Sequence, residues 1–382
     1  MITLFWILAA TVVYVYAGYP LLLALVHRVG GERRVSVGPV EPAVTLIVSA
    51  FNEEDVIAAK LRNCLELDYP RSKLQIIVVS DASDDRTDDV VAGFAPEGVE
   101  LLRMPVRSGK TLGLNAAVGR ARGEVVVFAD ANALYARNAV QKLVRNFADP
   151  AVGAAVGEST YLDPELESER SEGLYWRYET AIKRLESKVG SVVGGDGAIY
   201  AIRKALYTPM RADAISDFVN PLQIVRDGHR CIYEPEARSY ERAADNFDKE
   251  FRRKVRIVNR GWRAAFSLKA LLNPLRYGFF SVELFSHKVL RWLVPVFLVA
   301  LLCVNGWLVD RGPIYAVAMF LQVAFYVLAA LGHATRRRPS IPALLSVPYF
   351  FCLVNLASAL GIIDAFRGKT YTTWTTARAK TP

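Results

Sequence analysis

Three clusters of polar and acidic residues follow short apolar runs in the first third of this chain. They are Ser49–Glu54, Ser80–Asp85 and Asp130–Asn132. Carboxylate and amide oxygens bind hard divalent cations and accept hydrogen bonds from polar ligands. For one cluster alone, capping of the following helix is an equal alternative, and Asp84 or Asp85 suits that role. Three clusters at equivalent positions favour a shared binding site.

A cationic candidate lies between the second and third clusters. The segment Arg107–Lys110 reads Arg-Ser-Gly-Lys, and the Lys110 ammonium is suited to neutralising phosphate charge. A P-loop would need its first glycine at position 104, where the chain has Met104, so that motif is excluded.

Two further motifs lie downstream, each with two interpretations. The run Gly194–Ala198 (GGDGA) is either a tight turn or a place where a ligand approaches the backbone closely. Asp217 precedes an apolar, helix-compatible stretch at 218–225. Its carboxylate either caps that helix or takes a proton from a substrate.

The elements that must position these residues are readable from the apolar runs. Ala43–Ser49, Gln75–Ser80 and Glu124–Ala129 are short and rich in β-branched residues, and helix-compatible stretches separate them. This alternation predicts an α/β fold with a parallel-rich sheet covered on both faces. Ligands of such sheets bind beyond the carboxyl ends of the strands, where the polar clusters lie.

The motifs in this order resemble those of the family-2 glycosyltransferases. The resemblance is to the membrane-bound branch that includes cellulose, hyaluronan and poly-N-acetylglucosamine synthases. It covers about residues 44–262, and the flanking hydrophobic layout is similar as well. The resemblance implies a GT-A fold, which is a nucleotide-sugar-binding α/β domain with a C-terminal acceptor region.

The resemblance also implies roles for the donor side. Ala50, Asn52 and Glu53 would line the nucleotide pocket, next to a Phe where the family usually has Tyr. Asp81 would hydrogen-bond the base, and Lys110 would neutralise the phosphates.

The third cluster resembles the family's metal motif in a variant form. Asp130 would be the ligand of the implied cofactor, Mg²⁺ or Mn²⁺. Asn132 stands where Asp is common, and it would contact metal, ribose or sugar. Because hard cations keep several waters, one carboxylate and the diphosphate of the donor are sufficient.

On the acceptor side, Gly195, Asp196 and Gly197 resemble the family's glycine turn, and Asp217 matches its general base. The base would deprotonate an acceptor hydroxyl and so cause inversion at the anomeric carbon.

The last motif departs from the family pattern. Processive members carry Gln-x-x-Arg-Trp, whereas residues 256–262 read RIVNRGW and lack the Gln. Arg260 would still stabilise the diphosphate, and Trp262 would stack on the acceptor, but the altered motif no longer indicates polymerisation over many steps. The basic run at 252–256 is equally explained by a surface facing solvent or lipid.

Both ends of the chain are apolar. Ile2–Val26 has no charged side chain and is long enough to cross a bilayer, and it lacks the basic start of a signal peptide. Basic residues at 27–34 then place the following domain in the cytoplasm. Three more runs, at about 289–309, 313–333 and 341–363, are each long enough to span.

The charges near the C-terminus leave two topologies open. Arg336–Arg338 predicts a cytoplasmic loop, but four simple spans then place the basic segment 366–382 outside. Either the last run, which contains Pro348 and Asn355, is re-entrant or interfacial, or the charge rule does not hold here.

The expected organisation has five parts. These are a transmembrane helix at 1–28, a cytoplasmic GT-A domain at 40–264, interfacial amphipathic helices at 265–288, a transmembrane region at 289–365 and a basic tail at 366–382. A net charge of +9 with apolar ends indicates contact with anionic lipid, and no nucleic-acid-binding motif is present. The four cysteines have no metal-type or paired spacing.

The sequence therefore predicts an inverting, metal-dependent glycosyltransferase in the cell membrane. It would move a sugar from a nucleotide sugar, with UDP as the expected nucleotide, to a growing exopolysaccharide or cell-envelope glycan. A single transfer to a polyprenyl-phosphate or another lipid-linked acceptor is the alternative, and a non-catalytic nucleotide-sugar-binding scaffold is the third. Because four spans are few for an export channel, an export partner or a homo-oligomer is expected.

Overall fold

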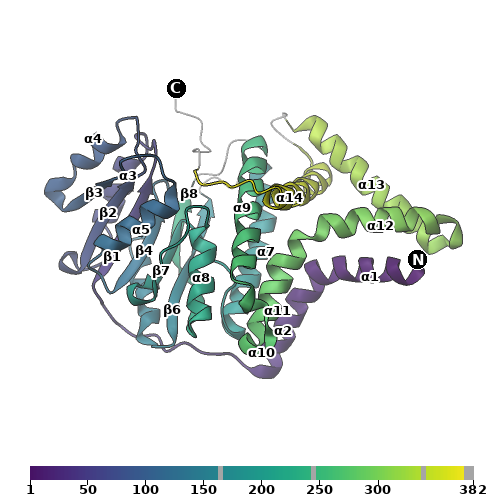
Figure 1. The fold of residues 1–382 in the computed structure, drawn as a ribbon, viewed down its shortest axis with the longest axis horizontal. Helices are drawn as coiled ribbons and strands as arrows, with labels where there is room; N and C mark the ends of the chain where they lie inside the picture. Colours follow the sequence, from purple (N-terminus) through teal and green to yellow (C-terminus); the bar gives the residue numbers. More distant parts are fainter. Residues whose placement is uncertain (162–166, 242–246, 337–340, 374–382) are drawn as a thin grey trace.

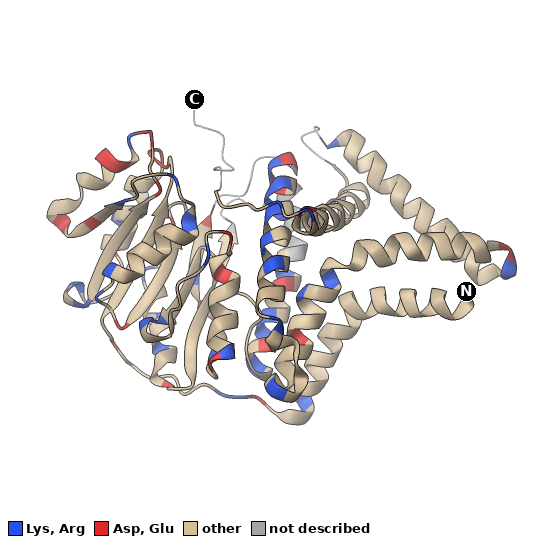
Figure 2. Ribbon diagram, in the orientation of Figure 1, with Lys and Arg blue, Asp and Glu red and all other residues tan. Residues whose placement is uncertain are grey.

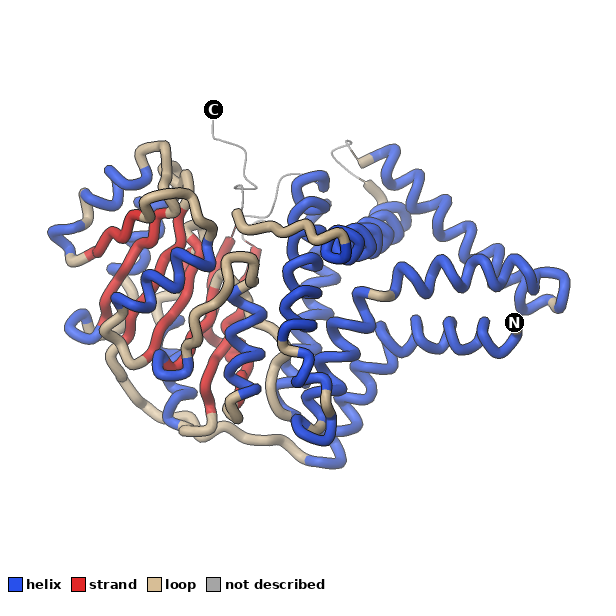
Figure 3. Tube along the Cα trace, viewed as in Figure 1, coloured by secondary structure: helices blue, strands red, loops and turns tan. Residues whose placement is uncertain are grey.

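The computed structural model describes residues 1–161, 167–241, 247–336 and 341–373 of the 382 residues. A sheet with its covering helices lies at one side, two long helices stand beside it, and apolar helices project from the other side (Figures 1 and 3).

The first half of the sheet is parallel. Its strands are β1 (Val44–Ala50), β2 (Leu74–Ser80), β3 (Val99–Arg103) and β4 (Val125–Asp130), in the order β3-β2-β1-β4. All residues of β1 and β2 are buried, as continuous apolar runs in a parallel sheet require. The three predicted strands are thereby confirmed to within one residue at each end. Because β1, β2 and β4 are parallel, their carboxyl ends lie along one edge of the sheet. The three polar clusters follow these ends and therefore lie along the same edge.

The second half of the sheet is mixed, and the apolar runs did not predict it. β7 (Ile199–Arg203) pairs antiparallel with β4, and β6 (Val152–Tyr161) pairs antiparallel with β7. β8 (Arg230–Glu241) runs parallel to β6, and the short β5 (Leu134–Tyr135) closes the edge. These pairings bring the segment before β7 and the end of β8 toward the carboxyl end of β4.

Helices cover both faces of the sheet. On one face lie α3 (Ile57–Leu65), α4 (Thr87–Ala92) and α6 (Ala139–Val144), whose buried residues join the cluster around Leu46. On the other face lie α5 (Lys110–Arg120) and α8 (Ser216–Arg226). The three-layer arrangement confirms the predicted α/β class.

Two long helices, α7 (Glu167–Val189) and α9 (Phe247–Ser267), connect the sheet domain to the apolar helices. Short helices follow α9, namely α10 (Pro274–Tyr277) and α11 (Phe279–Leu284), and a π-helical turn then spans Phe285–Leu290. Figure 2 shows charged residues along α9 and few of them on the projecting helices.

Four helices of the described residues are long and apolar enough to cross a membrane. The first combines α1 (Ile2–Val13) and α2 (Tyr19–Gly30) through a π-helical turn. The others are α12 (Val294–Leu308), α13 (Pro313–Thr335) and α14 (Ala343–Phe366).

The last apolar run forms one continuous helix. Pro348 lies inside α14, and the Asn355 side chain donates to the carbonyl of Phe351 at 2.9 Å, so its polar group is satisfied within the helix. α14 packs against α9, where the Asn259 side chain donates to the carbonyl of Gly361 at 3.3 Å. Of the predicted basic tail, residues 374–382 lie outside the described part of the chain.

The α9–α14 contact depends on a glycine. A Cβ added at Gly361 would lie 2.8 Å from the carbonyl oxygen of Val255 and 3.0 Å from the amide nitrogen of Asn259. We therefore expect Gly361→Ala to destabilise the protein by about 1–3 kcal/mol through overpacking. Thermal unfolding of the detergent-purified protein measures this loss.

The matched control is Gly119→Ala in α5, where an added Cβ meets nothing within 4 Å. Because alanine has a higher helix propensity than glycine, we expect this change to leave the stability of the protein unchanged or to raise it by about 0.5–1 kcal/mol. Equal melting temperatures for the two variants would contradict the close packing of α9 on α14.

Candidate active site

A cavity of about 810 Å³ opens beyond the carboxyl ends of β1 and β4, bordered by α8 and α9. This volume lies in the range of small-molecule sites. Most of the predicted site residues line it: Glu53, Lys110, Asp130, Asn132, Gly195, Asp196, Gly197, Asp217 and Arg260. Sequence positions that are far apart thus converge on one space.

The Lys110 ammonium lies at the centre of this group. It donates to the Asp130 carboxylate and, at 3.3 Å, to the carbonyl of Gly197. Burial lowers the pKa of Lys110, but the adjacent Asp130 and the nearby Asp217 outweigh this effect, so the pKa rises above its usual value. Lys110 is therefore a permanent cation in the cavity, as phosphate binding requires.

Gly109 allows the helix that carries Lys110 to start at this point. Its backbone has φ 91°, a conformation that side chains disfavour, and it is the N-cap residue of α5. The carboxylate of Asp81 accepts hydrogen bonds from the backbone amides of Ser108 and Gly109, at 2.7 and 2.8 Å. Asp81 thus fixes the loop that presents Lys110.

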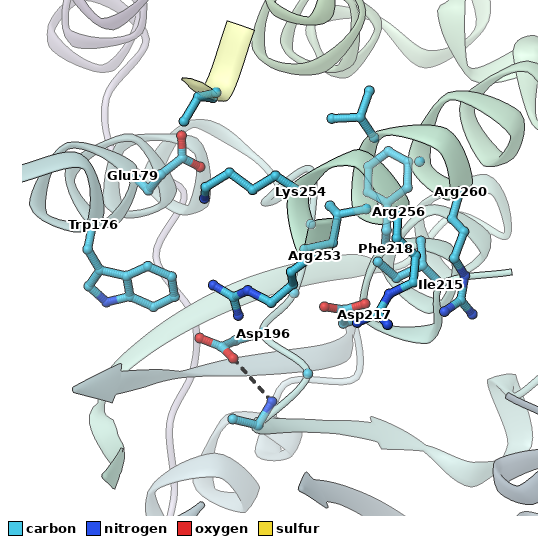
Figure 4. Close-up of a pocket in the computed structure, with 18 of the residues that line it drawn as sticks. Trp176, Glu179, Asp196, Ile215, Asp217, Phe218, Arg253, Lys254, Arg256 and Arg260 are labelled. Atoms are coloured by element: carbon cyan, nitrogen blue, oxygen red, sulfur yellow. Dashed lines mark hydrogen bonds between the residues drawn. The ribbon is translucent and has the colours of Figure 1, made fainter. Parts of the chain in front are cut away.

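Other carboxylates face the same cavity. Burial, together with Asp196 and Asp130, raises the pKa of Glu241 to about 8. Asp196 accepts from the backbone amide of Ala198 at 3.1 Å through one oxygen, shown in Figure 4. Its other oxygen is buried and has no hydrogen-bond partner among the described residues.

This donor set fits a divalent cation that is completed by a ligand. Asp130 lines the cavity at the end of β4, and the unpartnered oxygen of Asp196 is an oxygen ligand of the type that Mg²⁺ and Mn²⁺ accept. Within the described ranges, no three His, Cys, Asp or Glu side chains form a metal site by themselves. The diphosphate of a bound nucleotide would supply the missing oxygens.

Asp217 faces the cavity and does not cap its helix. The N-cap residue of α8 is Ile215, and no side chain caps this end. The backbone carbonyl of Asp217 accepts from the amide of Gly195 at 2.6 Å, which ties the glycine turn to α8. Burial, followed by the charges of Asp196 and Asp130, raises the pKa of Asp217, although Lys110 acts in the opposite direction. A raised pKa suits a base that must be protonated and deprotonated in turn.

A basic face of α9 forms the opposite wall. Arg253, Arg256 and Arg260 are three and four residues apart, so they lie on one side of the helix, and all three line the cavity (Figure 4). The guanidinium of Arg260 donates to the carbonyls of Asp213 and Ala214 and to the hydroxyl of Thr111. Burial and the neighbouring Arg256 lower the pKa of Arg260 to about 10.

The basic run at 252–256 is thus divided between two environments. Arg253, Lys254 and Arg256 line the cavity, whereas Arg252 is exposed. The sequence left a choice between a surface and a catalytic role. Helical spacing groups Arg253 and Arg256 with Arg260, but it does not separate Lys254 from Arg252, so the environments of those two depend on tertiary packing.

Ala50 and Asn52 do not line the cavity. Ala50 is buried at the end of β1, and its carbonyl accepts from the amide of Asp81 at 3.0 Å. Asn52 has φ 54°, and its side chain pairs with Asp84, accepting from the Asp84 amide at 3.0 Å. These residues and Asp81 therefore shape the loops around the site, and their predicted contacts with the nucleotide stay predictions.

Trp262 lies behind the cavity wall. It is buried against Phe266, Trp292 and Phe366, with ring centroids 4.6, 6.4 and 6.0 Å away. It is not among the cavity-lining residues, whereas Trp292 is. Trp262 thus has a packing role in this structure, and its predicted stacking on the acceptor stays a prediction.

Several lining residues escaped the motif search. They come from α7, from the end of β8 and from residues 287–292, none of which carries a motif of the family. These residues are Trp176, Glu179, Lys183, Glu241, His287, Lys288, Arg291 and Trp292. The one sequence signal for them is the presence of charged residues next to apolar segments.

Comparisons with known proteins agree with this geometry. A family model described as "Glycosyl transferase family 2" matches residues 45–206. The N-acetylglucosaminyltransferase of Rhizobium meliloti (strain 1021) is 26% identical over 268 residues, 63% of this chain and 62% of that protein. The "Probable glycosyltransferase YdaM" of Bacillus subtilis (strain 168) is 36% identical over 124 residues, 31% of this chain and 29% of that protein.

A beta-monoglucosyldiacylglycerol synthase of Trichormus variabilis is 33% identical over 117 residues, 30% of this chain and 25% of that protein. The chain spans less than two thirds of the length of each of these relatives. Among solved structures, the mannosyltransferase PcManGT from Pyrobaculum calidifontis, in complex with GDP-Man and Mn²⁺, superposes with a TM-score of 0.72. It is 24% identical, and the match covers 96% of this chain and 99% of that one. The comparisons confirm the predicted GT-A type of fold.

The buried carboxyl of Glu241 makes stability depend on pH. The unfolded chain loses this proton near the ordinary pKa of 4.5, whereas the folded protein keeps it to about pH 8. Between these values the folded state binds more protons, so the free energy of unfolding decreases as the pH rises. In metal-free and nucleotide-free protein, we expect Glu241→Gln to reduce the fall in melting temperature between pH 5 and pH 8.

Glu236→Gln on the same strand is the control. Hydrogen bonds from Arg145 and Lys142 lower the pKa of Glu236 to about 2, so it is ionised throughout this window. Its loss changes stability equally at all these pH values and leaves the slope unchanged. An unaltered slope in Glu241→Gln would show that this carboxyl is not protonated in the folded protein.

Proposed function

We propose that this chain, whose residues 45–206 match a family model described as "Glycosyl transferase family 2", is a membrane-embedded, inverting, metal-dependent glycosyltransferase. It transfers a sugar from a nucleotide sugar to an acceptor at the cytoplasmic face of the cell membrane. The observation that carries the proposal is the convergence of Lys110, Asp130 and Asp217 in one cavity at the carboxyl ends of the strands. A cation, a candidate metal ligand and a candidate base are the three parts that the reaction needs.

The donor is a nucleotide sugar, with a UDP-sugar as the first candidate. The similar Pyrobaculum structure contains GDP-Man and Mn²⁺, which supports a nucleotide sugar and a divalent cation as ligands of this fold. GDP-mannose is therefore the second donor to test. In this proposal Glu53 and Asn132 face the donor inside the cavity, and Asp81 contributes by holding the loop at Ser108.

The leaving nucleoside diphosphate develops negative charge as the glycosidic bond breaks. Lys110 and Arg260 project cationic groups into the cavity and stabilise this charge at fixed positions. Asp130, with Asp196 beside it, would hold Mg²⁺ or Mn²⁺, which supplies further positive charge to the diphosphate when it is bound.

Asp217 takes the proton of the attacking acceptor hydroxyl. The hydroxyl oxygen forms a bond to the anomeric carbon on the face opposite the diphosphate, and the electron pair of the broken bond leaves with the nucleotide. One displacement inverts the configuration once. Lys110 and Asp217 both lie against Gly197, so the proposed base and the proposed phosphate-binding cation share one small volume.

The acceptor proposed first is a growing exopolysaccharide or cell-envelope glycan, and a lipid-linked acceptor is the alternative. The apolar helices that border the domain support a membrane location. An export partner or a second copy of the chain belongs to this proposal as well. A scaffold that only binds ligand has no use for a buried carboxyl with a raised pKa beside a cation.

Asp217→Asn tests the base. We expect transfer to fall by about 10²–10⁴-fold, since general-base catalysis supplies that much, while nucleotide-sugar binding is retained. Because a raised pKa must be exceeded before the base is ionised, wild-type transfer should fall as the pH is lowered toward that pKa. Radiolabelled transfer and nucleotide release, measured from pH 5 to 9, provide the data.

Asp227→Asn is the matched control, since this exposed aspartate ends the same helix and pairs with Arg226 at 2.8 Å. It should keep wild-type transfer. Near-normal transfer in Asp217→Asn would remove Asp217 from the mechanism.

Asp130→Ala tests the metal ligand. We expect the Mn²⁺-dependent gain in nucleoside diphosphate affinity to fall by about tenfold or more, or about 1.4 kcal/mol. Binding without metal should not fall, because the change frees Lys110 from its ion pair. Calorimetric titrations with UDP and with GDP, each with and without Mn²⁺, measure the metal-free affinity and the metal-dependent gain in affinity. A metal-dependent gain equal to that of the wild type would exclude Asp130 as the ligand.

A further inference from the structure

A buried group of polar residues lies behind the wall of the cavity. Its centre is Glu186 of α7, whose side chain is fully buried and does not line the cavity. Neither the proposed donor site nor the proposed base uses this carboxylate. Because removing a carboxylate from water is costly, an apolar group of the same volume would stabilise the core at least as well. Packing alone therefore does not account for a carboxylate at this position.

Glu186 binds three different parts of the chain. Its Oε1 accepts from the hydroxyl of Tyr19 at 2.6 Å and lies 2.6 Å from Nδ1 of His287. Its Oε2 accepts from the backbone amide of Val193 at 3.2 Å. Tyr19 belongs to the first apolar helix, His287 to the π-helical turn before α12, and Val193 to the segment that leads into the glycine turn. One carboxylate thus joins a candidate membrane span to two segments that border the cavity.

The amide of Val193 lies at the start of the glycine turn, and this turn contacts both charged groups of the proposed reaction. The amide of Gly195 donates to the carbonyl of Asp217 at 2.6 Å. The carbonyl of Gly197 accepts from the ammonium of Lys110 at 3.3 Å. The bond from Val193 to the carboxylate on α7 therefore anchors a turn whose other bonds hold the proposed base and the proposed phosphate-binding cation.

A neighbouring carboxyl leaves the negative charge on Glu186. Glu283 of α11 is also buried, and its Oε1 has no hydrogen-bond partner among the described residues. Burial, followed by the charge of Glu186, raises the pKa of Glu283 well above its usual value. Glu283 therefore keeps its proton, whereas the Glu186 carboxylate accepts from Tyr19 and from the ring of His287.

The first apolar helix is fixed against this group at further points, and α2 packs against α7 (Figure 1). The hydroxyl of Tyr178 on α7 donates to the carbonyl of Tyr16, in the π-helical turn that joins α1 to α2, at 3.0 Å. The hydroxyls of Tyr14 and Ser286 lie 2.9 Å apart and connect this turn to the π-helical turn before α12. Such turns occur frequently at functional sites, and here two of them contact each other next to the residues that bind Glu186.

We propose that Glu186 is a positioning residue for sugar transfer and that Tyr19 couples it to the first apolar helix. The Tyr19 hydroxyl and the Val193 amide bind the two oxygens of one carboxylate, so a shift of α2 moves the carboxylate and the start of the glycine turn together. Tyr19 and Glu186 do not line the cavity, and they act through the turn on Asp217 and Lys110. This inference rests on the proposed function, and it makes the transfer step depend on how the first helix is seated.

The expected effect is a loss of rate without a loss of donor binding. Lys110 keeps its ion pair with Asp130 when the glycine turn loosens, so the affinity for the nucleotide changes little. The base, in contrast, loses a fixed backbone contact with Gly195. A misplacement of about 1 Å at a reacting group costs a reaction up to about 100-fold in rate.

The test compares Tyr19→Phe, Glu186→Gln and the double variant, each as the full chain in membrane vesicles, which supply the acceptor. The donors are UDP-glucose, UDP-N-acetylglucosamine and GDP-mannose with Mn²⁺, and nucleotide release gives kcat and KM for the donor that the wild type uses. Vesicles with Asp217→Asn give the background rate. Calorimetry of the purified variants with UDP or GDP measures nucleotide affinity, and melting curves measure the folded fraction.

We expect kcat to fall about fivefold or more in Tyr19→Phe and about tenfold or more in Glu186→Gln, while KM for the donor and nucleotide affinity stay within about twofold. The double variant should be no slower than Glu186→Gln alone, because Tyr19 acts only through this carboxylate. The control is Tyr315→Phe, which removes the hydroxyl of a buried tyrosine on α13 whose ring packs on Phe5 at 5.1 Å. It should keep the wild-type kcat.

Other outcomes overturn the inference in identifiable ways. A wild-type kcat in Tyr19→Phe would remove the coupling to the first helix, and losses that multiply in the double variant would show two independent effects. A fall in kcat that matches the fall in folded fraction would leave Glu186 a purely structural role. If Glu186→Gln does not fold, Tyr19→Phe decides the outcome, since Val193 and His287 still bind Glu186 in that variant.

Failure of the proposed function has a separate sign. Absence of nucleotide release by the wild type from every nucleotide sugar would overturn the proposed function, and this inference with it. Unchanged kcat in Tyr19→Phe and Glu186→Gln, in a protein that does release nucleotide, would overturn this inference alone.

Discussion

The ammonium of Lys110 is the interaction on which the site depends. It joins the end of β4, the start of α5 and the turn before β7, through Asp130 and the carbonyl of Gly197. The carboxyl groups of Asp130, Asp196, Asp217 and Glu241 are among those that line this cavity. Without a central cation they would repel one another in a space of low polarity. The positive charge of Lys110 allows these carboxyl groups to lie close together, and it is also the charge that would bind a diphosphate. One ammonium group therefore stabilises the site and serves the proposed chemistry.

Much of the parallel half could be predicted because local sequence determines it. The strands Val44–Ala50 and Leu74–Ser80 are buried throughout and mostly apolar, and the polar residues that follow them mark the site without further information. The second half depends on pairings between distant segments, since β6 aligns with both β7 and β8. Glu241 reaches the cavity through that pairing alone, and so no local pattern could indicate it. Motifs placed Asp130 and Asp217 in the site, but they could not show that Asp81 holds a loop.

The apolar helix α14 packs against α9 and is also a candidate membrane span. α14 lies on α9 through Gly361, and the Asn259 side chain bonds to the carbonyls of Gly361 and Lys369. The inner face of α9 carries the arginines of the cavity. A shift of α14 would therefore act directly on α9, the helix that carries Arg256 and Arg260. This arrangement explains why residues of α14 line the same cavity as the candidate base.

The departure of residues 256–262 from the Gln-x-x-Arg-Trp pattern also has a physical explanation. Gly261 lies between Arg260 and Trp262, and a Cβ there would lie 2.9 Å from two ring atoms of Trp292. The glycine thus lets the Trp292 ring lie directly on α9, where it lines the cavity, and Trp262 packs behind it against Phe266. The indole that lines the cavity thus comes from the segment that also carries Lys288 and Arg291. The altered spacing leaves Trp262 in a packing position and joins α9 to the cations that precede α12.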